Sequence, residues 1–351
     1  PLSRTHQWQG LQKIQNLRKA GKLMKTLLIT GANGFIGSTL VECAIQNNYK
    51  VTAAIRKGSD LNYLKDFDID YLEIDYNNKE DLNEKFSRLP AFDYIIHNAG
   101  ITKAKDEAGY HKVNVGNTKL LVETLIETGK VPHKFLFVSS LAAVGPVTYG
   151  KTIQDDTPGN PVTWYGRSKL VAENYFTTLN DFPWVIVRPT AVYGPKDKDI
   201  FVFIKMIHSG FNLSVGYRDQ ELSFIHSEDL VALLLEILRN GQTGKKYIGY
   251  DLRQYTSEDL SSAIKEALHK KAIRLRLPVG IISMVAFLSE KIGKLSGKIP
   301  ALNIDKVNEL KAQCWWCHSE NVKNLSNWQP KYDLYSGMKQ TIAWYKDKGW
   351  L

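Results

Sequence analysis

The stretch Thr30-Gly31-Ala32-Asn33-Gly34-Phe35-Ile36-Gly37 decides the fold that we expect for this chain. It follows an apolar run at residues 25–30 and precedes a helical pattern that continues to Ala44. Strand, glycine-rich turn and helix in this order form the context in which such a motif binds a dinucleotide. The first two glycines let the backbone turn and approach a pyrophosphate, and the third lets the helix lie close to the sheet. Free N–H groups at the helix start would then face the phosphates.

The end of the second strand indicates which dinucleotide is bound. This strand covers residues 50–55, and the adenosine ribose is expected beside its last residue. An NAD enzyme has an Asp or Glu there, whereas this chain continues Ile55-Arg56-Lys57-Gly58-Ser59 without an acid. A planar guanidinium suits a 2′-phosphate. We therefore expect NADP(H) to be preferred and NAD(H) to be the alternative cofactor, unless Arg56 is only a solvated loop charge.

Strand and helix signals alternate along the first half of the chain. Strands are expected at residues 71–74, 94–97 and 134–138, with helices from residue 79 and over residues 118–128. This rhythm predicts an α/β fold with a doubly wound parallel sheet. Ligands bind such sheets at the carboxyl ends of the strands. Small or polar residues follow the strands there, namely Asp75, Tyr76, Asn98, Ala99, Gly100, Ser139 and Ser140.

Tyr165 and Lys169 are four positions apart in a helical pattern, so they lie on the same face of a helix. An ammonium close to a phenol favours the ionised phenolate and lowers the pKa of the phenol. A tyrosine of this kind can donate or accept a proton near neutral pH. The alternative is a helix with a half-buried ring and a solvated lysine.

Six stretches occur in an order typical of one superfamily: TGANGFIG (30–37), HNAG (97–100), VSSLAAVG (138–145), YGRSK (165–169), RPTAVYGP (188–195) and SFIHSEDL (223–230). With them, residues 25–260 resemble the extended short-chain dehydrogenase/reductase superfamily of the NAD-dependent epimerase/dehydratase type. The resemblance implies a Rossmann-type fold and a Ser–Tyr–Lys catalytic group. Within the superfamily, the sequence is most similar in character to the branch that includes dihydroflavonol reductases and 3β-hydroxysteroid dehydrogenases.

The resemblance also implies roles for single residues. Ser140 would hold the substrate oxygen, Tyr165 would exchange the proton, and Lys169 would bond the nicotinamide ribose and bias Tyr165. Asn114 matches the family's asparagine, although the glycine that follows it is displaced in Asn114-Val115-Gly116-Asn117-Thr118. The expected cofactor-binding residues are Gly31, Asn33, Gly34, Phe35, Ile36, Gly37, Arg56, Asp75, Tyr76, Asn98, Ala99, Gly100, Ser139, Tyr165, Lys169, Pro189, Thr190 and Val192.

The second half of the chain should leave the sheet and return to it once. We expect residues 24–192 and 222–250 to form the dinucleotide-binding domain, and residues 193–221 and 251–351 a smaller, mainly helical substrate domain. Helices are expected at 200–207 and 257–268, the latter capped by Thr256. Nucleotide-sugar epimerases and dehydratases of the superfamily commonly have Arg-Asp before the Phe-Ile-His segment, where this chain has Leu222-Ser223. The diphosphate of a nucleotide sugar would lack the arginine guanidinium that binds it there, unless that arginine is replaced by Lys196, Lys198, Lys205 or Arg218.

These features predict an NADP(H)-dependent oxidoreductase that acts on a bulky apolar alcohol or ketone resembling a steroid, flavonoid or sphingoid. The alternative enzyme is an NAD-dependent nucleotide-sugar epimerase or dehydratase. A scaffold that binds cofactor without turnover is a third reading, which the complete Ser140, Tyr165 and Lys169 set disfavours.

Charge and composition limit the partners. Half of the formal charge of +10 comes from residues 1–23, which read as a leader or an added segment ahead of Met24. No basic stretch after residue 23 indicates nucleic-acid binding. The three cysteines fit a reducing compartment, so a cytoplasmic location is expected. Cys314 and Cys317 lack a second ligand pair for zinc, and we expect no metal site.

The apolar stretch at residues 279–288 leaves one question about location open. It is followed by Lys291, Lys294 and Lys298. It is either a buried lid helix with solvated lysines or a helix that lies on a membrane surface and admits a lipid-like substrate. Ten residues are too few to span a bilayer. Peripheral membrane contact and a homodimer therefore both remain open.

Overall fold

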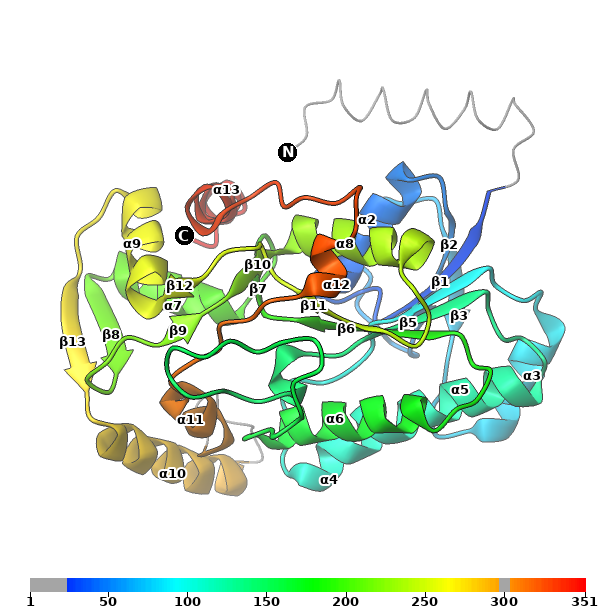
Figure 1. Cartoon of the computed structure of the whole chain (residues 1–351), viewed down its shortest axis with the longest axis horizontal. Helices are drawn as coiled ribbons and strands as arrows, with labels where there is room; N and C mark the ends of the chain where they lie inside the picture. Colours follow the sequence, from blue (N-terminus) through cyan, green and yellow to red (C-terminus); the bar gives the residue numbers. More distant parts are fainter. Residues whose placement is uncertain (1–23, 297–303) are drawn as a thin grey trace.

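A seven-stranded parallel sheet forms the centre of the protein in the computed structural model (Figure 1). The structure describes residues 24–296 and 304–351, so the expectation for the leader at residues 1–23 lies outside the described residues. The strand order is β11-β6-β5-β4-β1-β2-β3. The strands are β1 (Thr26–Thr30), β2 (Lys50–Ile55), β3 (Asp70–Glu73), β4 (Tyr94–His97), β5 (Lys134–Val138), β6 (Trp184–Pro189) and β11 (Lys246–Gly249).

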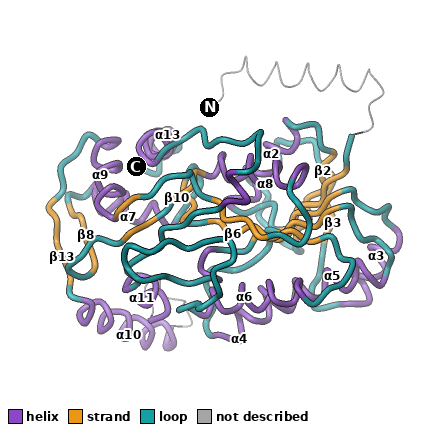
Figure 2. Tube along the Cα trace, in the orientation of Figure 1, coloured by secondary structure: helices purple, strands orange, loops and turns teal. Residues whose placement is uncertain are grey.

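Helices cover both faces of this sheet, so the predicted doubly wound α/β fold is confirmed (Figure 2). One face packs against α2 (Phe35–Gln46) and α8 (Ser227–Asn240). The other face packs against α3 (Lys79–Arg88), α5 (Asn117–Glu127) and α6 (Trp164–Thr177). The central strands β1, β4, β5 and β6 are nearly continuous apolar runs and are buried on both sides, as is usual in parallel sheets, whereas the edge strand β3 is mostly exposed.

The strand order reverses direction between β1 and β4. The chain proceeds from β1 through β2 to β3 on one side, and from β4 through β5 to β6 on the other. β1 pairs in parallel with both β2 and β4. The two crossovers therefore diverge at the carboxyl ends of β1 and β4, which leaves a crevice where open α/β sheets bind their ligands.

A second lobe has its own apolar core. Its main helices are α7 (Asp199–His208), α9 (Ser257–Leu268) and α13 (Leu334–Asp347). Thr256 begins α9 with a capping box, as predicted, because its hydroxyl accepts from Asp259 N at 3.2 Å and Asp259 Oδ2 accepts from Thr256 N at 2.7 Å. The remaining elements are β7 (Ala191–Tyr193), β8 (Phe211–Val215), β9 (Glu221–Leu222), β10 (Phe224–His226), β12 (Tyr255–Thr256), β13 (Ile273–Leu277), α4 (Glu107–Tyr110), α10 (Val279–Ser296), α11 (Ile304–Lys311) and α12 (Glu320–Lys323).

The chain returns to the central sheet after β8. β10 pairs with β7, and β11 adds the last parallel strand beside β6. The chain then leaves the sheet again for β12 and α9.

The apolar stretch at 279–288 forms the first part of the longer helix α10. Ile282 and Ala286 are buried, whereas Met284, Phe287 and Leu288 are 58%, 49% and 51% exposed. The prediction of a buried lid helix is therefore wrong for this outward face. The physical reason is that a helix apolar on every side finds neighbours here on one side only.

Candidate active site

The glycine turn after β1 has the close backbone approach that the sequence predicts. Gly31 has a φ of +65°, and a Cβ on it would lie 2.9 Å from the backbone of Ala99. A Cβ on Gly37 would lie 2.0 Å from the carbonyl oxygen of Gly31. Gly34 begins α2 without a side chain that could cap its first N–H groups. The turn therefore fits a pyrophosphate at the start of α2.

The end of β4 lies directly beside this turn. Asn98 Nδ2 donates to the Gly31 carbonyl at 3.5 Å, and Ala99 N donates to Thr30 Oγ1 at 3.0 Å. A Cβ on Gly100 would lie 3.1 Å from Asn114 Oδ1 and 3.3 Å from Lys169 Nζ. The residues between the glycine turn and Lys169 thus have small side chains or none, which would let a dinucleotide lie close to the backbone.

Arg56 and Tyr76 come together just beyond the carboxyl ends of β2 and β3, where the sequence predicts the adenosine. Arg56 is exposed just after β2, and its charge opposes the burial that raises the pKa of Tyr76. Asp75 Oδ1 accepts from the backbone and side-chain nitrogens of Asn77 at 2.9 and 3.0 Å, which lowers the pKa of Asp75. Asn33 Nδ2 donates to the Asp60 carbonyl at 3.2 Å and so ties the glycine turn to the loop after β2.

Helix α6 holds Tyr165 and Lys169, and residues from both lobes fix its first turn. Thr163 Oγ1 accepts from Gly166 N at 3.0 Å. The carboxylate of Asp305 on α11 accepts from Trp164 N at 2.8 Å and also from Tyr165 N. These acceptors satisfy the N–H groups that a helix start leaves open.

Lys169 is buried without a carboxylate in direct contact. Its Nζ donates to the Val138 carbonyl at 2.9 Å and lies 4.7 Å from the centre of the Phe137 ring. Burial lowers the pKa of Lys169 to about 8. The ammonium faces Gly100 across the crevice, since a Cβ on that glycine would nearly touch it.

Tyr165 differs from the prediction in its acidity. Burial raises the pKa of its phenol to about 12, and a hydrogen bond with the Ser140 side chain opposes this shift only in part. The prediction that Lys169 lowers the pKa of Tyr165 is therefore wrong. The reason is that the Lys169 ammonium is bonded to Val138, whereas the phenol loses solvation in the crevice.

Ser140 and Asn114 hold the backbone on either side of Tyr165. Ser140 begins a 3₁₀ turn, η2 (Leu141–Ala143), and its Oγ accepts from Ala142 N at 3.2 Å. Asn114 lies in a π-helical turn, η1 (His111–Gly116), where the displaced glycine is the last residue. Its side chain accepts from Ile101 N at 2.9 Å and donates to Ser168 Oγ at 2.9 Å. Such π turns are frequent at functional sites.

Ser139 points away from the crevice, into a buried ion pair that sequence reasoning missed. Its hydroxyl donates to Glu173 Oε1 at 2.6 Å. Glu173 is 0% exposed and bonds Arg188 Nη2 at 2.6 Å, with Lys246 Nζ 3.5 Å away. The available signals were an acid four residues after Lys169 and an arginine directly before Pro189.

The residues at and after the end of β6 contact neighbouring strands. Pro189 is the last residue of β6, and Thr190 donates from N and Oγ1 to the Gly249 carbonyl at 3.0 and 3.2 Å. Val192 pairs with Ile225 between β7 and β10. The Thr190 hydroxyl is therefore already engaged by the protein.

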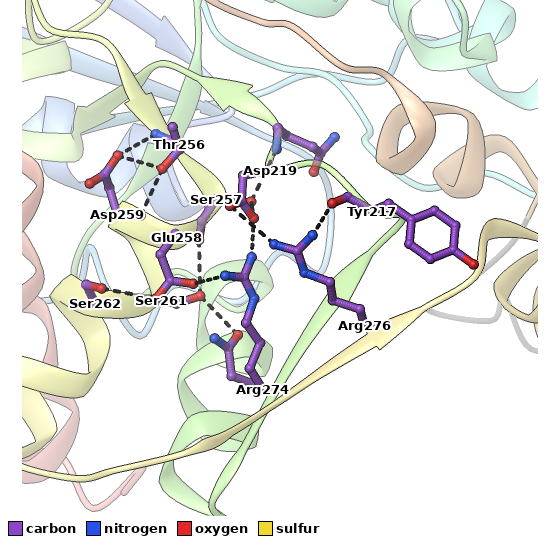
Figure 3. A network of polar contacts seen from close by, with 12 residues as sticks. Tyr217, Asp219, Thr256, Ser257, Glu258, Asp259, Ser261, Ser262, Arg274 and Arg276 are labelled. Atoms are coloured by element: carbon purple, nitrogen blue, oxygen red, sulfur yellow. Dashed lines mark hydrogen bonds and ion pairs between the residues drawn. The ribbon is translucent and has the colours of Figure 1, made fainter.

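The position of the missing arginine faces a mainly apolar cavity in the second lobe, whose polar lining residues are Asn212, Ser214, Gln220, Ser257, Ser261 and Arg274. The cavity measures about 90 Å³, and Leu222 lies on its wall. Arg274, also on the wall, is paired with Asp219 and with Glu258, whose Oε2 lies 2.8 Å from Arg274 Nη1 (Figure 3). Arg276 and Lys265 share these two carboxylates. The other apolar lining residues are Phe203, Met206, Ile207, Phe211, Leu213, Val215, Leu260, Ile264 and Leu310.

Three of the cations that could replace that arginine have other contacts. Lys196 Nζ donates to Ser38 Oγ at 3.0 Å and lies 4.9 Å from the centre of the Tyr63 ring. Lys205 lies over the Phe201 ring, and Arg218 over the Tyr149 ring. Lys196 thus lies near α2 and the glycine turn rather than beside Leu222.

The described residues contain no cluster of three His, Cys, Asp or Glu side chains suited to a metal ion. Cys314 and Cys317 are 0% and 1% exposed. Cys314 Sγ donates to the Lys151 carbonyl at 3.1 Å, so this thiol is part of the packed interior.

Comparisons with known proteins agree with this geometry. A family model described as "NAD dependent epimerase/dehydratase family" matches residues 27–251. A ceramide reductase from Caulobacter vibrioides is 26% identical over 325 residues, which cover 92% of this chain and 95% of the relative. A UDP-glucose 4-epimerase from Vibrio cholerae is 25% identical over 334 residues, 91% of this chain and 95% of the relative. The crystal structure of a dTDP-glucose 4,6-dehydratase from Bacillus anthracis in complex with NAD has a TM-score of 0.72 at 20% identity, covering 92% and 97% of the two chains.

Proposed function

Because the chain belongs to the NAD dependent epimerase/dehydratase family and is therefore an enzyme, we propose that it is an NADP(H)-dependent oxidoreductase acting on a bulky apolar alcohol or ketone. In this proposal residues 24–192 and 222–250 form the dinucleotide-binding domain, and residues 193–221 and 251–351 form the substrate domain. A steroid-, flavonoid- or sphingoid-like compound is the intended substrate class.

The chain's own residues would handle the proton and the oxygen. The nicotinamide supplies or accepts the hydride. Tyr165 donates its phenolic proton to the substrate oxygen during reduction, or accepts it during oxidation. Ser140 steadies the same oxygen, since its hydroxyl already hydrogen-bonds the phenol. Lys169 lies beside Gly100, where its ammonium can bond the nicotinamide ribose, and Asn114 holds the loop that contains Gly100.

Mutation of the proton donor tests this assignment. We expect Tyr165→Phe to abolish turnover with NADPH while the cofactor still binds, because the ring remains and only the proton is lost. Ser140→Ala should leave a trace of activity, a loss of about 10²–10³ in kcat, as expected for one missing donor. Near-normal turnover in Tyr165→Phe would contradict the assignment.

Arg56 supports the preference for NADP(H). It is exposed beside Tyr76, and no acid stands directly after β2 to accept from a 2′-hydroxyl. Titration of NADPH and NADH into the wild type and Arg56→Ala checks this. Arg56→Ala should weaken NADPH and leave NADH unchanged, and equal affinities in the wild type would contradict the preference.

The observation that carries the substrate class is Leu222. An arginine that would bind a nucleotide diphosphate is replaced by an apolar wall residue, and the guanidinium on that wall is already engaged by two carboxylates. A diphosphate brought there would be desolvated without a bidentate partner. The relative named as a ceramide reductase supports the same substrate class.

A substrate screen tests the class directly. Purified enzyme is mixed with NADPH and with steroid, flavonoid or long-chain ketones, and nucleotide sugars serve as controls. Loss of absorbance at the nicotinamide band with an apolar ketone is the expected result. The relative named as a UDP-glucose 4-epimerase favours a second function, an NAD-dependent nucleotide-sugar epimerase or dehydratase. Tightly bound NAD together with unaided conversion of a sugar nucleotide would establish that alternative instead.

A further inference from the structure

One side of helix α10 is an apolar surface that no described element covers. Ile281, Met284, Val285 and Leu288 follow the spacing i, i+3, i+4 and i+7, and they are 46%, 58%, 45% and 51% exposed. Phe287 beside them is 49% exposed. Scattered apolar side chains on a surface are ordinary, but a contiguous stripe marks an interaction site. We call these five side chains the α10 face.

The opposite side of α10 explains why the helix keeps its place. Ile282 and Ala286 are buried against Val307 of α11, with Val215 and Leu277 packed around them. The α10 face is therefore turned outward while the helix remains attached to the second lobe. In Figure 1, α10 lies along the outer edge of that lobe, below β8 and β13.

We propose that the α10 face docks this enzyme on the surface of an anionic lipid bilayer. The charges of the helix fit that occupant, because the exposed Lys291 follows the α10 face directly and the α10 sequence contains one more lysine than acid. Lys291 Nζ lies 4.7 Å from the centre of the Phe287 ring. An interfacial helix combines such features, with its apolar side chains among the acyl chains and its lysines at the head groups.

A second copy of this chain fits the α10 face less well. The core of a protein interface is depleted of charged residues, and lysine in particular is disfavoured there. Burying Phe287 against another protein would also desolvate the ammonium that lies over its ring. A head-group region accepts the ring and keeps the ammonium hydrated.

The contact would be peripheral. In the part of the chain that the structure describes, no helix combines the length and apolarity needed to cross a membrane.

The docking surface is connected to the catalytic helix through two described contacts. α10 packs on Val307, and Asp305 on the same helix α11 accepts from Trp164 N, next to Tyr165. Leu310 of α11 lines the apolar cavity. A bilayer under α10 would thus present an apolar substrate on the side of the lobe where α11 meets the crevice, a step that rests on the proposed function.

Vesicle sedimentation of the full chain tests the docking without any enzymatic readout. We expect the wild type to sediment with phosphatidylcholine vesicles that contain phosphatidylglycerol, and much less with phosphatidylcholine alone. Met284→Glu/Leu288→Glu should lose at least tenfold in vesicle affinity, and Lys291→Glu should lose the preference for anionic vesicles. The matched control is Ile126→Glu/Val131→Glu, at side chains that are 47% and 36% exposed in and just after α5.

Each outcome has a defined meaning. Cofactor binding and melting temperature first establish that every variant is folded. A wild type that stays in the supernatant, or a control that loses as much as the α10 variant, would overturn the proposal. A dimer in sedimentation velocity that Met284→Glu/Leu288→Glu dissociates would also overturn it, in favour of self-association. Turnover of a water-soluble short-chain ketone should be unchanged in the α10 variant, so a failure of the substrate assignment is seen separately from a failure of docking.

Discussion

Two titratable side chains at the crevice have pKa values that burial moves in opposite directions. The phenol of Tyr165 is raised to about 12 and the ammonium of Lys169 is lowered to about 8. Both shifts disfavour the charged form, as desolvation does. Tyr165 is consequently protonated at every physiological pH and is ready to donate. Lys169 is the group whose charge changes near neutral pH.

We predict that kcat/KM for NADPH falls above about pH 8, tenfold for each further unit. The sign follows from the lowered pKa: the ammonium is present below about 8 and is lost as the pH rises through that value. Rate profiles from pH 6 to 10 measure the effect. Lys169→Arg is the control, because a guanidinium keeps its charge beyond pH ~12. A wild-type profile that is flat over this range would contradict the assignment.

Removal of one partner from the buried pair of Glu173 and Arg188 should strongly destabilise the protein. The two side chains are 0% and 2% exposed. Glu173→Gln would leave the guanidinium buried without its counter-charge, and breaking such a pair costs about 3–5 kcal/mol. Urea unfolding should show a clearly lower midpoint. The exposed pair of Glu84 and Arg88 supplies the control, since Glu84→Gln should change the midpoint little. Equal effects in the two variants would show that burial does not decide the contribution.

At the scale of single elements, α6 is the helix on which the proposed chemistry depends. Its own sequence supplies the Thr163 cap, but the acceptor for Trp164 N comes from α11, at a sequence separation of 141 residues. The orientation of Tyr165 therefore depends on a contact between the two lobes. Asp305 acts through the backbone of α6 and is a positioning residue.

Asp305→Ala should lower kcat and leave the affinity for NADPH nearly unchanged, because the glycine turn is untouched while the start of α6 loosens. Loss of a cap of this kind costs about 1 kcal/mol. Asp305→Asn retains an acceptor oxygen and should recover most of kcat. Steady-state kinetics together with cofactor titration make the comparison. If Asn and Ala reduced kcat equally, the carboxylate would matter through its charge rather than as an acceptor.

At the scale of the whole molecule, α13 ties the second lobe to the strands beside the crevice. Tyr193 on β7 is 1% exposed, and its hydroxyl donates to the Asp333 carbonyl at 3.0 Å, at the start of α13. A Cβ on Gly337 of α13 would lie 2.2 Å from that hydroxyl. The strand and the helix approach each other here too closely for a side chain at position 337.

Gly337→Ala should therefore destabilise the protein by about 1–3 kcal/mol, the usual cost of overpacking. Gly280 on α10 is a helical glycine whose Cβ would meet nothing within 4 Å, so Gly280→Ala should stabilise by about 0.5–1 kcal/mol. Adding Tyr193→Phe to Gly337→Ala should restore part of the loss. Thermal melting of the four proteins measures these differences, and a neutral Gly337→Ala would show that α13 shifts freely.

The sequence alone determined the local geometry of this protein. Predicted strands at 50–55, 94–97 and 134–138 and the helix at 257–268 coincide with β2, β4, β5 and α9. Glycine sterics at Gly31 and Gly37, apolar periodicity and the Thr256 cap all act within a few residues, so they can be read from neighbouring letters. The order of strands and helices then led to the doubly wound sheet.

Only the tertiary structure decided which distant groups meet and which side chains lose water. The Asp305 contact with α6, the pairing of Glu173 with Ser139 and Arg188, and the raised pKa of Tyr165 all depend on packing between separated segments. The exposure of the α10 face also depends on packing between separated segments, because an apolar sequence does not show which side of a helix will contact other elements. Burial and charge pairing are properties of the assembled fold, and no local pattern encodes them.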